Sequence, residues 1–328
     1  MSKNRPRLIV ILLSISVCLL ALINIGIGDI YISPISIVNA LLGQGDKDVI
    51  YTLLYYRAPR ICLAVLVGAS LAIAGAVMQS ILRNPLAAPD TLGVSGGAAI
   101  SALALISFFP AFSFLTMSLA AFVGGSIAAA IVYILAYKNG TDPVRLALVG
   151  VSVSALCGSG VEFTLLRIES SAQTSLLWLN GSLFGRGWEH VAIVVPFFLI
   201  ILLVVLLLFV RLEGIKLGDE TAIGLGISVE KTRIIFLGLS TLLTGVSISA
   251  VGMIGFVGLI SPHIAQQLVG HRFLLPVSIL VGSLVLLIAD TIGRTILHPL
   301  EIPAGIVTSL LGAPYFLFLL YQESKKNG

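Results

Sequence analysis

Charged side chains are scarce in this sequence of 328 residues. Asp, Glu, Lys and Arg make up 10% of it, whereas about 25% is usual for soluble domains. Hydrophobic residues make up 58%, and the mean hydropathy is +1.10. This balance excludes a soluble globular protein. Since one helical crossing of a bilayer takes about 20 apolar residues, the sequence predicts an all-α polytopic membrane protein with about ten transmembrane helices. Residues 1–328 would form a single transmembrane domain.

Cysteine, histidine and phosphate-binding motifs are equally sparse. The three cysteines lie within apolar stretches without Cys-x-x-Cys spacing, and the four histidines are scattered without a His-Glu-x-x-His motif. We therefore expect no metal site and no cofactor, and an enzyme within the membrane would need a clustered catalytic set that we do not find. The dipeptide Gly-Lys is absent, which excludes ATP hydrolysis through a P-loop. Any ATP-driven step must come from a partner.

The positions of the crossings follow from the length of the apolar runs and from the residues that interrupt them. Ten spans are expected. They are Leu8–Ile27, Ile61–Leu82, Leu92–Phe109, Phe112–Tyr137, Leu146–Leu166, Val191–Val210, Ile234–Val251, Met253–Val269, Leu274–Ile292 and Ile302–Tyr321. The seventh and eighth spans meet at a glycine-rich junction, where glycine either turns the chain or lets helices approach closely.

Basic residues predict the orientation of these spans. With the N-terminus inside, thirteen of the 19 Lys and Arg residues fall on the inner side, so we expect both termini to be cytoplasmic. The basic residues are spread over short connectors and form no face typical of nucleic-acid binding. Three arginines, Arg57, Arg60 and Arg294, stand at outward helix ends, where the rule disfavours them. Two ordinary explanations are open: snorkelling to the interface and, for Arg294, a pair with Asp290 four residues earlier.

The inner loop 211–233 mixes charged residues with small and apolar ones at helical spacing. A short helix from about Asp219 to Leu225 is expected, because Asp219 and Glu220 would stand in its first turn, where the helix dipole favours acids. It would end at Gly226. The loop is either a contact for a partner or an amphipathic connector on the membrane surface, and spacing alone favours the connector.

Glu162 is an acidic residue within the fifth span. An ionisable residue at membrane depth is a functional hypothesis by default. It lies only four residues from the expected helix end, so its carboxylate can also simply reach water. The second explanation is favoured on position alone.

Eight short motifs occur in order along the chain. They are Arg57–Arg60, Gly75–Gln79, Arg83–Asp90, Leu92–Val94, Trp178–Leu183, Gly218–Glu220, Gly255–His263 and Leu311–Pro314. Together they resemble the FecCD/BtuC-type permeases, the family of ABC importers for ferric siderophores, haem and cobalamin. The resemblance runs from about Leu8 to Tyr321 and is closest to the ferric-citrate and siderophore branch.

This resemblance implies the type II ABC importer permease fold and a location in the cytoplasmic membrane. It implies transport by alternating access, with no catalysis by this chain. The implied partners are a second permease subunit, two ATPase subunits inside and an extracytoplasmic substrate-binding protein. A ferric siderophore or ferric citrate is the favoured cargo, while haem and cobalamin remain open. An ion-coupled secondary transporter is the alternative outside the family, and it should show ionisable relays near the midplane.

The resemblance also implies roles for individual residues. The loop between the sixth and seventh helices contacts the ATPase in such importers. For the inner loop 211–233, the resemblance therefore favours a partner contact over an amphipathic connector. The residues implied there are Gly218, Asp219, Glu220, Ala222, Leu225 and Gly226. The outward arginines Arg57, Arg60 and Arg294 match positions that pair with glutamates of the binding protein. Arginine suits this task because its planar fork holds a carboxylate bidentately.

Two further assignments follow from the same resemblance. Asn84 and Leu86 match the inward gate, although Asn-Pro ends helices whatever the function. The second gate element falls at Asp142 and Pro143, which depart from the small hydroxyl residues of the family, so no gate residue is assigned there. Glu162 lies on the helix that lines the transport path in the family, which makes it a candidate for contact with the cargo.

Overall fold

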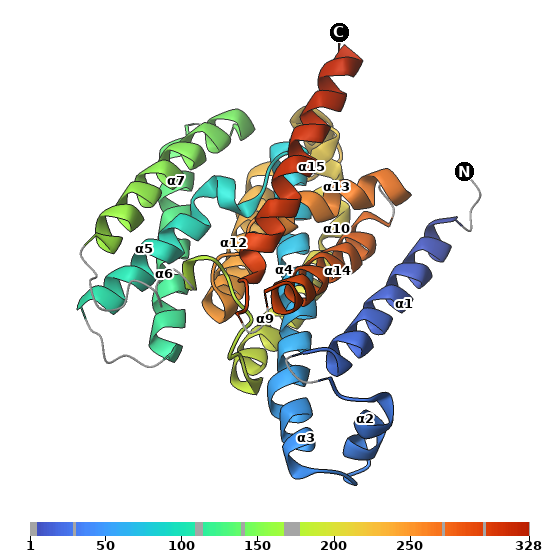
Figure 1. Cartoon of the computed structure of the whole chain (residues 1–328). Coiled ribbons are helices and arrows are strands. Elements are labelled where there is room, and N and C mark those ends of the chain that lie inside the picture. Colours follow the sequence, from blue (N-terminus) through green and yellow to red (C-terminus); the bar gives the residue numbers. More distant parts are fainter. Residues whose placement is uncertain are drawn as a thin grey trace.

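Helices make up almost all of the described chain (Figure 1). The computed structural model describes residues 5–28, 31–108, 114–138, 142–166, 178–270, 273–297 and 300–327. A helix coincides with each of the ten expected spans. These helices are α1 (Arg5–Gly26), α4 (Ala58–Leu82), α5 (Val94–Phe108), α6 (Phe114–Ala136), α7 (Pro143–Leu165), α9 (Trp188–Leu207), α12 (Val229–Val251), α13 (Val257–Val269), α14 (Leu274–Thr295) and α15 (Ala304–Asn327).

The helices differ in how far they can reach across a membrane. Seven within the described ranges are long and apolar enough to cross it. Within the described residues, α5 covers 15 residues up to the gap at 109–113 and α13 has 13, whereas α15 has 24. About ten membrane helices is therefore a fair description, and α13 is shorter than a full crossing.

Short helices occupy the ends of the bundle. Between the first two spans lie α2 (Pro34–Leu41), α3 (Lys47–Tyr51) and the π-helical η1 (Thr52–Arg57), and α3 and η1 run directly into α4. After α4 comes the 3₁₀ turn η2 (Pro89–Leu92), and after α9 come α10 (Phe209–Lys216) and α11 (Asp219–Gly224). We call the end with α2 and α3 the outer end and the end with α10 and α11 the inner end. Both chain termini lie toward the upper half of Figure 1, away from α2 and α3.

Helix α4 runs through the middle of the molecule (Figure 1). It packs against α14, α12, α13 and α9, and most of its length is buried. Helices α5, α6 and α7 pack on one another at one side, and α1 packs on α14 at the opposite side. The largest apolar core cluster of the described residues contains Ile73 and Val77 of α4 and Phe236 of α12, and it extends to α6, α7 and α9.

Close packing around α4 depends on glycine. A Cβ on Gly75 would lie 1.7 Å from the carbonyl oxygen of Gly258 in α13, and a Cβ on Gly68 would lie 2.4 Å from that of Gly282 in α14. Real side chains do not approach a backbone so closely. Small residues allow such contacts between helices in lipid, where burial of apolar surface does not drive helix association.

The junction between the seventh and eighth spans is a break in the helices. Gly252 has φ of +81° and Phe256 has φ of +66°, so α12 and α13 are separate. Segment 178–186 fills this break, since the N–H of Ser182 donates to the carbonyl of Val251 at 2.8 Å and that of Gly305 donates to Gly181 at 3.0 Å. The Trp178–Leu183 motif therefore joins α12 to the start of α15.

Replacing Gly75 with alanine is expected to destabilise the fold, because α4 and α13 must separate to admit the methyl group. Overpacking of this kind costs about 1–3 kcal/mol. Gly238→Ala is the matched control, since Gly238 lies on α12 with no atom within 4 Å of its virtual Cβ. Thermal unfolding in detergent should show a lower melting temperature for Gly75→Ala only. Equal melting temperatures for the two variants would contradict this account of the helix contact.

Candidate functional site

The expected short helix in the inner loop is confirmed as α11, Asp219–Gly224, one residue shorter than predicted. Gly218 precedes it with φ of +111° and Gly226 follows it with φ of +76°. Both values lie in the positive-φ region of backbone conformation, which residues with a Cβ disfavour. Glycine is therefore required at both ends to bring the chain into α11 and out again.

Helix α11 exposes apolar side chains at the inner end. Ala222 is buried against the protein, whereas Ile223 and Leu225 are 65% and 63% exposed. Leu217, at the end of α10, is 64% exposed. We call Leu217, Ile223 and Leu225 the coupling patch. Exposed apolar groups bordered by charged residues such as Glu220 mark a surface that contacts either a protein partner or the membrane.

Asp219 connects α11 to two other helices. Its carboxylate forms an ion pair with Arg83, the residue that ends α4, and another of 2.9 Å with Arg233 of α12. The Arg83 Nε also donates to the carbonyl oxygen of Ile215 at 2.9 Å. Neither arginine partner of Asp219 is predictable from the sequence, because Arg83 lies 136 residues away and Arg233 lies 14 away, beyond the range of a local pattern.

The turn after α4 holds the two expected gate residues together. The side-chain oxygen of Asn84 accepts a hydrogen bond of 2.9 Å from the N–H of Leu86. Asn84 is exposed and Leu86 is half-buried. This is the turn chemistry expected for Asn-Pro, and it places both residues at the inner end beside Arg83. Asp142, where no gate residue is assigned, caps α7 by accepting from the N–H of Val144 at 2.8 Å.

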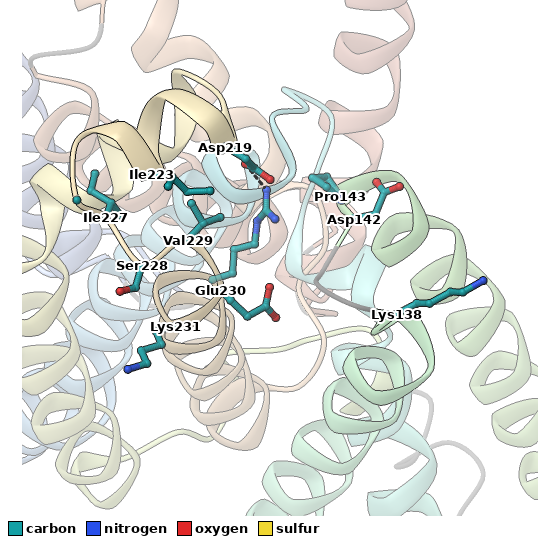
Figure 2. A pocket seen from close by; sticks show the side chains of 12 residues that line it. Lys138, Asp142, Pro143, Asp219, Ile223, Ile227, Ser228, Val229, Glu230 and Lys231 are labelled. Carbon is teal, nitrogen blue, oxygen red and sulfur yellow. Dashed lines mark hydrogen bonds and ion pairs between the residues drawn. The ribbon is translucent and has the colours of Figure 1, made fainter.

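A cleft of about 960 Å³ lies beside α11 (Figure 2). Figure 2 shows Asp219 at its top, Glu230 and Lys231 of α12 below it, and Asp142 and Lys138 across from them. Glu230 is held by a hydrogen bond of 2.6 Å from the Tyr133 hydroxyl. The coupling patch thus borders an open cleft with charged walls, which adds to the surface that a partner can contact.

The outer end carries an ion-pair cluster around Arg60. Its guanidinium contacts Asp290 at 2.8 Å and Glu301 at 2.8 Å, with two hydrogen-bonding nitrogens toward each carboxylate. Asp290 also pairs with Arg294 at 3.4 Å. The i, i+4 pair considered for Arg294 is therefore present. Because Asp290 is only 2% exposed, it holds both arginines in a region where an unpaired charge would be costly.

The three outward arginines come together around one cavity of about 310 Å³, together with Glu301 and a fourth arginine, Arg186. Arg57 is 6% exposed, and its Nη1 donates to the carbonyl oxygen of Ile25 at 2.7 Å. Burial lowers the pKa of Arg186 to about 10, which leaves it charged at neutral pH. Arg186 and Glu301 also line this cavity, and neither stands in a sequence pattern that points to it.

Glu162 lies apart from both clusters. It is exposed near the end of α7, a helix at the side of the molecule (Figure 1). Leu148, Leu156 and Phe163 are exposed on the same helix. Among the residues that the structure describes, these side chains of α7 are left largely exposed.

This bundle of apolar helices, with charged clusters at its two ends, defines a multi-pass membrane protein. The model of the FecCD transport family matches residues 13–322, and the chain belongs to that family. Sequence analysis anticipated this membership from the eight motifs.

Relatives and solved structures agree over nearly the full length. The chain is 43% identical to the Fe(3+)-citrate import system permease protein YfmE of Bacillus subtilis (strain 168), covering 99% of this chain and 98% of that protein. It is 40% identical to the Fe(3+) dicitrate transport system permease protein FecD of Escherichia coli (strain K12), covering 85% of this chain and 88% of that protein. A solved metal-chelate type ABC transporter in an inward-facing conformation aligns with a TM-score of 0.86 at 31% identity, covering 96% and 99%. The expected permease fold is confirmed.

The outer cluster yields a stability prediction. Asp290→Asn removes a carboxylate shared by two buried arginines, and breaking a buried pair costs about 3–5 kcal/mol. Glu301→Gln removes a more exposed partner of Arg60 only, so its cost should be smaller. Thermal unfolding in detergent should give a melting temperature for Asp290→Asn well below that for Glu301→Gln. The reverse order would show that Glu301, and not Asp290, holds the cluster together.

Proposed function

We propose that this chain is the transmembrane permease subunit of an ABC importer that carries a ferric siderophore or ferric citrate across the cytoplasmic membrane by alternating access. One observation carries the proposal: the chain is 43% and 40% identical to permease proteins named for ferric citrate, over 99% and 85% of its length. The coupling patch exposed at the inner end supports it. The names of the relatives favour an iron chelate over haem or cobalamin.

The proposed energy source is a pair of separate ATPase subunits on the cytoplasmic side. The absence of Gly-Lys from the sequence requires a partner for ATP hydrolysis. The coupling patch and the glycines at both ends of α11 support an ATPase contact there, with Asp219, Glu220 and Ala222 positioned by the same short helix. A second permease subunit, identical or similar, would complete the transport path.

The proposed outer partner is a substrate-binding protein that presents carboxylates to Arg57, Arg60 and Arg294. The gathering of these arginines around one cavity supports this role. Arg60 already holds Asp290 and Glu301, and Glu301 is the more exposed of the two. A carboxylate from the binding protein would therefore compete with Glu301 for the outer side of the Arg60 guanidinium.

Alternating access then requires a change at the inner end. Asn84 and Leu86 are the proposed inward gate, supported by their position in the turn beside α11. Glu162 is proposed to face the transport path, supported by its exposure near the end of α7. ATP can drive the change only if the two states make different contacts with the ATPase. The chain would move cargo without catalysing a reaction.

Uptake of radioactive iron chelates into proteoliposomes tests the function. The vesicles contain this chain, its ATPase and its binding protein. Uptake should require ATP and should stop when the ATPase carries an inactivating P-loop substitution. Uptake that persists without the ATPase and follows an ion gradient would replace the importer with a secondary transporter.

The same vesicles test the outer surface with two matched variants. Arg60→Gln removes the guanidinium, whereas Glu301→Gln breaks the ion pair and keeps the guanidinium. Affinity for the binding protein should fall for Arg60→Gln and hold or rise for Glu301→Gln. Equal losses in the two variants would show that the cluster matters only for folding.

Leu225→Asp tests the inner surface. A charge in the centre of an apolar contact is expected to weaken ATPase binding by about 2 kcal/mol or more, which is the scale of interface hot spots. Leu42→Asp is the control, because Leu42 is 67% exposed at the outer end, after α2. Co-purification should show loss of the ATPase for Leu225→Asp only. Normal co-purification of both variants would place the ATPase contact elsewhere.

A further inference from the structure

The end of α4 is held from outside the helix. Arg83 follows the last residue of α4 with φ of +48°, a left-handed conformation that residues with a Cβ disfavour. Its side chain binds the carbonyl of Ile215 at the end of α10 and the carboxylate of Asp219 at the start of α11. The inner end of α4 is thus tied to the segment that carries the coupling patch.

The same carboxylate oxygen of Asp219 reaches a second helix. It accepts from the Nη2 of Arg233 at 2.9 Å. The Arg233 side chain is only 3% exposed and is fixed on α12. Helix α12 in turn contacts α4 directly, since the Ser240 hydroxyl donates to the carbonyl of Ala74 at 3.1 Å. Asp219 therefore stands where α4, α11 and α12 meet.

Few other contacts hold α11 in place. The helix has six residues, of which Ala222 alone is buried, and it packs against α10 and α12. An isolated surface ion pair would add little, because holding two flexible side chains in one geometry offsets their attraction. Here the buried Arg233 already fixes the Asp219 carboxylate. The pairing with Arg83 therefore requires less additional ordering.

We propose that Asp219 is a positioning residue for transport: the Arg83–Asp219–Arg233 cluster transmits the movement of α11 to the end of α4 and so to the gate turn at Asn84. Arg83 directly precedes Asn84 in the chain, so a displacement of Asp219 pulls on the residue that begins this turn. The proposal rests on the function proposed above, because it requires that an ATPase moves α11.

The test measures iron chelate taken up per ATP hydrolysed by the complete transporter in proteoliposomes. Asp219→Asn keeps the shape of the side chain and removes its charge. It should lower this ratio about 5-fold or more, the lower range of measured couplings between sites, in the transporters that assemble. Asp219→Glu should restore most of the ratio. Glu213→Gln breaks an ion pair with Lys216 on neighbouring α10 and should leave the ratio unchanged.

A double-mutant cycle identifies the partner. Arg83→Gln alone should lower the ratio, and adding it to Asp219→Asn should lower the ratio little further, because both changes break the same link. If Asp219→Asn fails to assemble, Arg83→Gln decides the matter, since it leaves the Asp219–Arg233 pair in place.

Two outcomes overturn the proposal. One is a normal ratio in Asp219→Asn or in Arg83→Gln. The other is a double variant whose ratio falls by the product of the two single-variant factors, which would show that the two residues act independently. Both are read against an unmodified transporter that does show ATP-dependent uptake. If the unmodified transporter shows no such uptake, the proposed function fails first, which distinguishes the two failures.

Discussion

The close contact of α4 with α13 and α14 is the constraint on which the rest of the structure depends. At Gly75 and Gly68 the backbones approach so closely that a methyl group has no space. This contact fixes α4 in the centre of the bundle as a continuous helix of 25 residues, roughly 37 Å at 1.5 Å per residue. A helix fixed in this way can carry a displacement from one end to the other, which a loosely packed helix cannot.

Helix α4 has an arginine in an ion-pair cluster at each end, and the two clusters differ in burial. Arg60 binds Asp290 and Glu301 in a mostly buried setting, where loss of a partner is costly. Arg83 binds the more exposed Asp219, whose carboxylate the buried Arg233 also holds. The outer cluster thus suits a fixed platform, and the inner cluster suits a link through which α11 and the end of α4 move together.

Local patterns in the sequence predicted much of this arrangement. Apolar runs located the ten helices, and the acids before Gly226 located α11. The pair of Asp290 with Arg294 was also anticipated, because residues four apart share a helix face. The eight motifs indicated the family, which the full-length matches confirm.

Contacts between distant parts of the chain were not predictable in the same way. Glu301 reaches Arg60 across 241 residues and Asp219 reaches Arg83 across 136, separations at which no periodicity connects two positions. Helices α2 and α3 were missed because they are short and are begun by single capping residues, Ser33 and Asp46, and not by long apolar runs. The eighth span was expected to start at Met253, whereas α13 starts at Val257, after Phe256 with its positive φ. The length of an apolar run does not reveal such a break in the helix.

Hydrogen–deuterium exchange on the assembled transporter in lipid nanodiscs tests most directly whether the α11 region and the end of α4 move as one unit. Exchange would be compared with and without a non-hydrolysable ATP analogue, in segments 79–90 and 217–226. Segments that open together form one cooperative unit. The account predicts that both segments change their protection together when the analogue binds. A change in 217–226 alone, with 79–90 unaltered, would contradict it.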